Sequence, residues 1–214
     1  MRAFLVAAVV SLCTAAAGLV GPAAVADVTG SGLPVEDYAA YDPQTTCTKQ
    51  PRAGTVELGE WLVATYGGAG GAVNRPCTGS GSSEHKDGRA IDWTLDAEDP
   101  ADRKLAKAFL ADAFATDPDG NAAALARRMG IMYLIWNDHM YAAWNQFQPE
   151  SYLSSSCRSK RRCSKTLRHR DHMHVSLSKA GAKGLTSFFA EPLAGRPGAS
   201  QTGAPPGEVA SRGH

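Results

Sequence analysis

Two histidine-containing segments place the strongest constraint on how this chain can fold: residues 83–92 and residues 169–174. The first reads Ser-Glu-His-Lys-Asp-Gly-Arg-Ala-Ile-Asp, and the second reads His-Arg-Asp-His-Met-His. Neutral imidazole and carboxylate groups are ligands that zinc takes, and a catalytic zinc site uses three protein ligands and leaves one position for water. A fold that brings these two distant segments together therefore creates a zinc site.

The predicted zinc ligands are His85, Asp92 and His174. Three further groups in the second segment would lie beside the metal, where they could move protons or stabilise charge: His169, Asp171 and His172. Hydrolysis of a peptide needs such a group, because the proton of the attacking water must be passed to the leaving amine. An isolated pair of histidines on a strand is more often a surface pair, so the prediction depends on both segments together.

Local periodicity predicts that two of the ligands lie on strands. In residues 90–95 the apolar side chains alternate with Asp92, and in residues 172–177 they alternate with His174. If these strands are neighbours, the two ligands project from the same side of the sheet. A glycine between His85 and the first strand permits a tight turn that returns this histidine toward Asp92.

The remaining apolar patterns predict helices around this sheet. Helices are expected over residues 56–66, 101–115, 121–129 and 180–189, with Thr55 as the N-terminal cap of the first, and a further apolar strand is expected over residues 131–136. Strands mixed with helices, without a regular βαβ rhythm, indicate an α+β domain. We expect a small antiparallel sheet that carries the zinc site and is packed by helices.

The chain divides into four parts. Residues 1–26 resemble a signal peptide, because an apolar run follows Arg2 and ends in Ala-Val-Ala, a cleavage signal; a transmembrane anchor is the alternative. Residues 27–53 form an extended lead-in, and residues 54–190 a zinc peptidase-like domain. Residues 191–214 form a Pro/Gly-rich tail that is expected to be disordered, because it has too little apolar surface to offset its ordering entropy. The mature protein is expected to be secreted, with no integral membrane segment.

Cysteine usage supports an exported protein. Without the signal peptide four cysteines remain, which indicates two disulfides with three possible connectivities. We favour Cys47–Cys77 and Cys157–Cys163, because each pair flanks a local loop. Zinc binding by these cysteines is disfavoured, since no pair has the spacing of a zinc ribbon. The formal net charge of +1 says little about partners.

The pattern S-x-H-x-x-G-x-A-x-D, followed downstream by H-x-D-H-x-H, resembles the zinc D-Ala-D-Ala carboxypeptidases and their relatives. That superfamily is named for lysostaphin, D-Ala-D-Ala metallopeptidases and sonic hedgehog. The resemblance covers residues 75–178 and is greatest to a group of secreted actinobacterial proteins. It implies zinc ligands at the three positions named above, an acid/base group at Asp171 or His172, and a transition-state stabiliser at His169. It also implies that an upstream arginine, here Arg75, binds a substrate carboxylate.

Two assignments within this resemblance stay open. Strand alternation favours His172 as the acid/base group, whereas the family offers precedent for either residue, and we favour Asp171. Ser83 is predicted to line the substrate site as a turn residue and not as a nucleophile, because no serine-hydrolase motif surrounds it. The interval between the motifs is longer than in compact family members, and Asp171 stands where the dipeptidases have glutamate. The resemblance therefore does not imply that this protein cleaves a D-Ala-D-Ala bond.

These observations predict a secreted zinc-dependent peptidase that cleaves peptidoglycan stem or cross-link peptides by metal-activated water. The alternative is a catalytically silent, zinc-stabilised domain that binds the cell wall or a polyanion. Residues 158–170 hold a dense basic run, which is either a solvated loop or a contact for anionic cell-wall polymers. Nucleic acid is not expected as a partner, because no nucleic-acid-binding signature accompanies the basic run.

Overall fold

The computed structural model describes residues 34–79, 81–190 and 196. The predicted signal peptide lies outside this part of the chain, as does the tail apart from Arg196. No helix within the described residues is long and apolar enough to span a bilayer. The described part is an α+β fold, so the expected fold class is confirmed.

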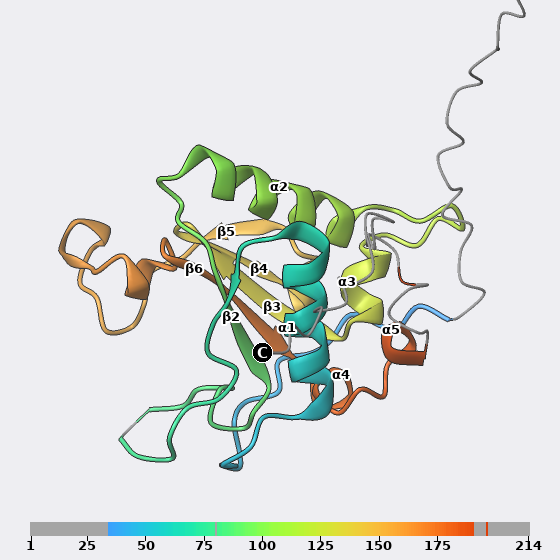
Figure 1. Cartoon of the computed structure of the whole chain (residues 1–214), viewed down its shortest axis with the longest axis horizontal. Helices are drawn as coiled ribbons and strands as arrows, with labels where there is room; N and C mark the ends of the chain where they lie inside the picture. Colours follow the sequence, from blue (N-terminus) through green and yellow to red (C-terminus); the bar gives the residue numbers. More distant parts are fainter. Residues whose placement is uncertain (1–33, 80, 191–195, 197–214) are drawn as a thin grey trace, which may run out of the picture.

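The centre of the fold is a six-stranded sheet in which every neighbouring pair of strands is antiparallel (Figure 1). In spatial order the strands are β1 (Ala69–Gly70), β2 (Ala90–Thr94), β6 (His172–Leu177), β3 (Ile131–Trp136), β4 (His139–Ala142) and β5 (Pro149–Ser151). The helices are α1 (Ala53–Tyr66), α2 (Pro100–Phe114), α3 (Ala124–Arg128), α4 (Lys179–Ala182) and α5 (Ser187–Ala190). Short 3-10 helices are η1 (Ala143–Asn145), η2 (Lys160–Arg162) and η3 (Thr166–Arg168).

Helices α1 and α2 cover one face of the sheet (Figure 1). Trp93 of β2 and Val175 of β6 point toward these helices, where they pack with Leu58 of α1 and Phe109 of α2 in a single buried cluster. Alternate side chains of β2 and β6 therefore face away from the main core. This leaves their polar residues on the opposite face, where the predicted site lies.

The strand predictions hold closely, because period-two alternation and a short apolar run are both local properties of the sequence. Residues 131–136 and 172–177 form strands with the predicted bounds, and the strand predicted over 90–95 ends one residue earlier. Ile91 and Trp93 are buried as expected.

Three helix predictions are wrong in detail. Helix α1 begins at Ala53 with Arg52 as N-cap, and the Thr55 hydroxyl instead donates to the Gly88 carbonyl at 2.8 Å. The helix predicted over 121–129 is limited to α3, because Ala123 has a left-handed backbone. The helix predicted over 180–189 is two short helices, since the chain turns at Gly184, where φ is 73°.

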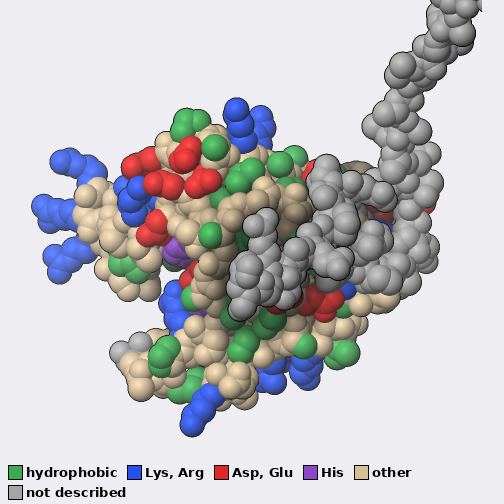
Figure 2. Space-filling model, in the orientation of Figure 1, with side chains coloured by type: hydrophobic (Ala, Val, Ile, Leu, Met, Phe, Trp, Pro, Cys, Tyr) green, Lys and Arg blue, Asp and Glu red, His purple; other side chains and the backbone are tan. Residues whose placement is uncertain are grey.

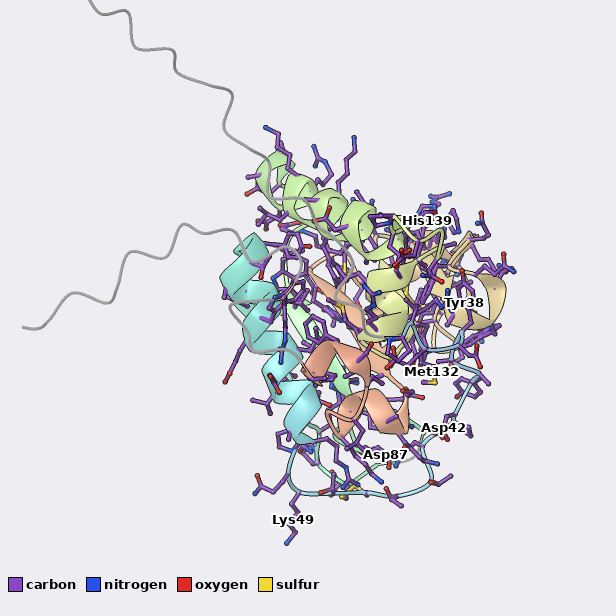
Figure 3. The ribbon with its side chains drawn as sticks, turned by 90° about the vertical axis from the view of Figure 1, so that its right-hand side faces the viewer. Tyr38, Asp42, Lys49, Asp87, Met132 and His139 are labelled. Atoms are coloured by element: carbon purple, nitrogen blue, oxygen red, sulfur yellow. A yellow bond between two sulfur atoms is a disulfide. The ribbon has the colours of Figure 1, made fainter. Side chains whose placement is uncertain are left out.

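The lead-in predicted over 27–53 ends one residue early, because Ala53 begins α1; its residues 34–52 contain no helix or strand but are fixed to the domain. The buried Arg89 guanidinium donates to the carbonyls of Asp42 and Leu177 and forms an ion pair with Asp87. The Asp42 backbone also contacts Met132 of β3, and Figure 3 shows the lead-in running along this side of the molecule. Polar contacts thus hold a segment that has no regular structure of its own.

Both predicted disulfides are present: Cys47–Cys77 and Cys157–Cys163. The first joins the lead-in to the segment that precedes the first histidine motif, and the second closes a loop before β6. Disulfides of this kind are consistent with an extracellular protein.

Candidate metal centre

The pairing of β2 with β6 brings two predicted ligands together. Asp92 lies directly opposite His174 in this antiparallel pair, so both side chains project from the same face. Ile135 of β3 lies opposite His174 on its other side. The apolar neighbours in each strand point to the main core, so the same alternation serves the core and the site.

His85 reaches the site from the turn that precedes β2. The Arg89 backbone N–H donates to the Glu84 carbonyl at 2.9 Å and closes this turn, in which Gly88 has a left-handed backbone with φ of 68°. A Cβ atom on Gly88 would lie 2.8 Å from the Gln50 carbonyl oxygen. Glycine is therefore required both for the turn and for its approach to the lead-in.

Three ligand atoms converge at this point. His85 Nε2 lies 2.9 Å from Asp92 Oδ1 and 3.2 Å from His174 Nδ1, and the last two atoms are 3.1 Å apart. Tetrahedral zinc with bonds of about 2.0–2.1 Å separates its ligand atoms by roughly 3.3 Å. The three residues are all buried, and their spacing and chemistry fit a divalent metal.

The protonation states of these groups also suit a metal. Burial acts to raise the pKa of the Asp92 carboxyl, but hydrogen bonds from His174 and His85 outweigh burial and hold this pKa well below its ordinary value. Burial lowers the pKa of His85, more than its hydrogen bond to Asp92 raises it. His174 Nε2 lies 2.9 Å from the Ser176 hydroxyl, which can accept the Nε2 proton and leave Nδ1 free for a metal.

His172 and Asp171 lie beside this cluster in different positions. His172 Nε2 is 3.5 Å from Asp92 Oδ1, and this buried atom makes no hydrogen bond within the described structure. Its Nδ1 lies 2.7 Å from Asp171 Oδ1, while the other oxygen of Asp171 accepts from the Thr166 hydroxyl. The imidazole therefore faces the cluster and the carboxylate lies behind it.

His169 lies at the end of η3 and also faces the site. Its ring centroid is 4.8 Å from that of His172 and 5.6 Å from that of His174. Burial, with a smaller effect from these two histidines, lowers the pKa of His169 to about 3, so the ring is neutral near pH 7. A neutral imidazole in this position can donate a hydrogen bond.

A cleft of about 640 Å³ opens onto the histidines (Figure 2). One wall comes from residues within 75–78 and 81–86 and the other from residues within 152–156 and 166–167, and the histidines of the second motif form its base. Figure 2 shows histidine at the base of the hollow between these two lobes. Of the three predicted ligands, His174 lines the cleft, whereas His85 is fully buried.

The two predicted substrate-binding residues line this cleft. Arg75 is half-exposed, and its Nη2 lies 3.4 Å from the second oxygen of Asp92. The Ser83 carbonyl accepts from the Lys86 backbone N–H at 2.8 Å, which begins the turn that carries His85.

Tyr133, Glu84 and Ser176 belong to the site but were not predicted as site residues. The Tyr133 hydroxyl donates to the buried Glu84 carboxylate at 2.7 Å, and its ring stacks on His174 with centroids 5.6 Å apart. Tyr133 sits in an apolar run, which gave no signal of this contact. Ser176 did carry a signal, because it follows His172 and His174 on the same face of β6.

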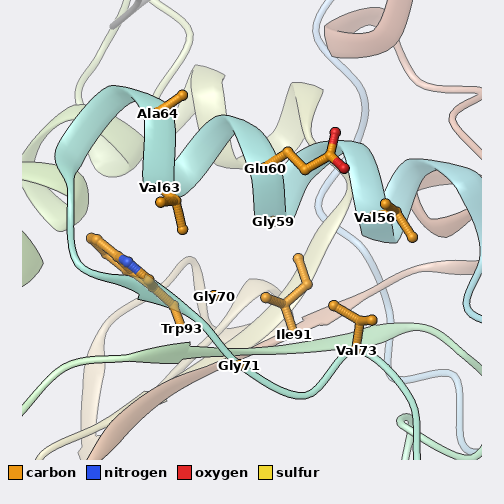
Figure 4. Close-up of a pocket in the computed structure, with 10 residues that line it drawn as sticks. All are labelled: Val56, Gly59, Glu60, Val63, Ala64, Gly70, Gly71, Val73, Ile91 and Trp93. Atoms are coloured by element: carbon orange, nitrogen blue, oxygen red, sulfur yellow. The ribbon is translucent and has the colours of Figure 1, made fainter. Parts of the chain in front are cut away.

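A second hollow of about 440 Å³ lies between α1 and the edge of the sheet (Figure 4). Its lining is mostly apolar, and Val63, Ile91 and Trp93 point into it. Glu60 is the one titratable residue in this lining. The hollow therefore lacks the groups that the chemistry of the first cleft requires.

More than half of the chain matches the model of a known protein family. The chain belongs to the family described as the VldE C-terminal domain, whose model matches residues 47–159. The matched segment contains the first histidine motif and ends before the second. Searches of the curated proteins and of the solved structures gave no match.

Proposed function

We propose that this protein is a secreted zinc-dependent peptidase that acts on peptidoglycan stem or cross-link peptides. The observation that carries the proposal is the convergence of three buried ligand atoms next to an open cleft, which His174 lines, beside a histidine nitrogen with no hydrogen bond. The resemblance of both histidine motifs to the zinc D-Ala-D-Ala carboxypeptidases supports the substrate class.

The residues that would hold the zinc are His85 through Nε2, Asp92 through Oδ1 and His174 through Nδ1. When bound, the ion would polarise the scissile carbonyl and lower the pKa of a water molecule. Ser176 would keep the proton of His174 on Nε2, which fixes the ligand tautomer.

Within this proposal, His172 carries the proton. Asp171 accepts a hydrogen bond from Nδ1 of His172, so the lone pair of Nε2 is directed toward the cluster. His172 can then accept a proton there and deliver it to the leaving amine. This geometry favours His172 over our sequence-based preference for Asp171 and gives the carboxylate an orienting role.

The remaining polar groups suit a peptide substrate. His169 is neutral and lies close to His172 and His174, so it can donate a hydrogen bond to the oxygen that becomes negatively charged. Arg75 is half-exposed on the cleft wall, where its guanidinium can pair with a substrate carboxylate. These positions give the proposed reaction a donor and a substrate anchor.

Metal analysis of the purified protein tests the ligand assignment. We expect one zinc per chain, with loss of zinc in His174→Ala and retention in His139→Ala, a control on β4 outside the cleft. Equal zinc content in the two variants would refute the assignment. Incubation of the zinc-loaded protein with purified muropeptides, followed by mass spectrometry, tests the activity. Zinc binding without cleavage would favour the silent binding domain.

A further inference from the structure

The segment between β5 and β6 is the most basic part of the described chain. Residues 151–170 contain no acidic residue and seven basic ones. The basic residues are Arg158, Lys160, Arg161, Arg162, Lys165, Arg168 and Arg170. The proposed peptidase chemistry gives this charge no role.

Four of these seven residues are held by contacts within the fold. Lys160 donates to the Ser151 hydroxyl at 2.9 Å and to the Asp138 carbonyl. The other three form ion pairs: Lys165 with Asp96 and Glu98, Arg168 with Asp138, and Arg170 with Glu98. These contacts attach the segment to the body of the domain.

The other three residues, Arg158, Arg161 and Arg162, form what we call the basic tip. All three are exposed, and none of their side chains has a hydrogen bond or ion pair within the described residues. The loop that carries them projects from the domain (orange in Figure 1), and basic side chains point outward there in Figure 2. A projecting surface suits an extended polymer, because small ligands bind in concave pockets.

The loop is constrained before any partner binds. The disulfide Cys157–Cys163 closes it, and η2 forms one turn within it, in which the Cys163 backbone N–H donates to the Lys160 carbonyl. A constrained loop loses less conformational entropy on binding. The three charges are thus presented together at a small ordering cost.

We propose that the basic tip binds a polyol-phosphate polymer of the type found in teichoic acids. Phosphate is favoured because all three side chains are arginines, whose guanidinium groups bind phosphate in a bidentate manner. Nucleic acid is disfavoured because Tyr152 is the one aromatic residue in this segment, and it is only half-exposed, so no platform for stacking bases is present.

Binding at the basic tip would bring the cleft close to the bound polymer. The same segment supplies one wall of the cleft through residues 154–156 and 166–167. A polymer held at the basic tip therefore lies next to the opening of the candidate site. The contact uses none of the metal ligands, so it goes beyond the proposed peptidase and does not depend on it.

Binding of the full-length chain to immobilised poly(glycerol phosphate), measured at several salt concentrations, tests the proposal. We expect Arg158→Gln/Arg161→Gln/Arg162→Gln to bind about 100-fold more weakly at low salt and with a shallower salt dependence. The control Lys104→Gln/Lys107→Gln/Lys183→Gln removes three exposed charges elsewhere and should bind like the wild type. Chelation of metal should leave all three affinities unchanged.

A second variant separates the arginine fork from the charge. Arg158→Lys/Arg161→Lys/Arg162→Lys keeps the charge, and we expect an intermediate affinity because lysine binds phosphate as a point charge. An equal loss in the control variant would overturn the assignment to the basic tip. Equal binding of polyglutamate would overturn the preference for phosphate, and tighter binding of a DNA duplex or single strand of equal charge would overturn the polymer class.

Discussion

Asp171 and His172 are adjacent in sequence but have different positions relative to the ligand cluster. The histidine Nε2 is 3.5 Å from Asp92 Oδ1, whereas Asp171 contacts the far nitrogen of the same ring. A group that receives the proton must reach the reacting atoms, and a group behind it can act only through the ring. The roles of these two residues in proton transfer can therefore be distinguished by experiment.

We predict that His172→Ala lowers kcat/KM for a cleaved muropeptide by about 10²–10⁴-fold with its zinc content unchanged. Added imidazole should restore part of this activity, because the small base can occupy the vacated space. Asp171→Asn should also retain zinc and lose activity, but imidazole should not restore it. If imidazole fails with His172→Ala and Asp171→Asn is equally inactive, Asp171 is the direct proton acceptor.

His169 gives the metal-free protein a pH-dependent stability. Its pKa is about 3 in the folded state and about 6.5 when unfolded. Between these values the unfolded chain binds the extra proton, so the stabilisation is complete above about pH 6.5 and is lost as the pH falls toward 3. We predict that the free energy of unfolding falls by up to about 1.4 kcal/mol per pH unit through this group.

Urea unfolding of the chelator-treated protein between pH 7.5 and 4 measures this effect. His169→Asn is the matched variant, because asparagine tolerates the left-handed backbone at this position, where φ is 50°. The free energy of unfolding of this variant should depend less steeply on pH. Some dependence should remain, because His85 contributes a change of the same sign. An unchanged slope would contradict the role given to His169.

At the level of elements, two glycines of helix α1 differ in how much space surrounds them. A Cβ atom on Gly54 would lie 2.2 Å from the Gly181 carbonyl oxygen and 2.5 Å from the Gly184 nitrogen. A Cβ atom on Gly59 would meet Ile91 Cγ2 at 3.6 Å, which is ordinary contact. Backbone atoms cannot move aside as a side chain can, so the first position has no room.

We therefore predict opposite effects of the same substitution within one helix. Gly54→Ala should lower the free energy of unfolding by about 1–3 kcal/mol or more through overpacking. Gly59→Ala should raise it by about 0.5–1 kcal/mol, because alanine favours the helix and meets no obstacle. Denaturant unfolding of both variants under one set of conditions measures the difference, and a change of the same sign in both would contradict the packing argument.

At the level of the whole molecule, the two disulfides close loops of very different length. Cys47–Cys77 spans 30 residues and joins the lead-in to the segment that carries Arg75, whereas Cys157–Cys163 spans 6. The longer loop restricts the unfolded chain more, so its loss has the larger entropic effect. The shorter bridge acts mainly on the loop that bears the basic tip.

We predict that replacing both cysteines of Cys47–Cys77 by serine lowers the free energy of unfolding by about 3–4 kcal/mol, against about 2 kcal/mol for Cys157–Cys163. Guanidinium unfolding of the two double variants provides the comparison. Removal of Cys157–Cys163 should also weaken binding to poly(glycerol phosphate), and removal of Cys47–Cys77 should leave that binding intact. The reverse pattern would contradict the preorganisation argued for the basic tip.

The parts of this fold that follow from local pattern were predictable. Alternation of apolar side chains predicted β2 and β6, with Asp92 and His174 at the polar positions, because the side-chain period of a strand is a property of the backbone. A short apolar run predicted β3. The glycine turn before β2 and both disulfides were predicted in the same way, from residues close in sequence.

Other features depend on contacts between residues far apart in the chain. The Thr55 hydroxyl bonds to Gly88 instead of capping its helix, and Tyr133 joins the site through Glu84 and His174. Strand alternation favoured His172 on the ligand face, but the contact of Asp171 with the far nitrogen of this ring became clear only from the folded structure. A helix cap or an apolar strand residue has the same local pattern in either role, and only the distant partner that it meets on folding distinguishes them.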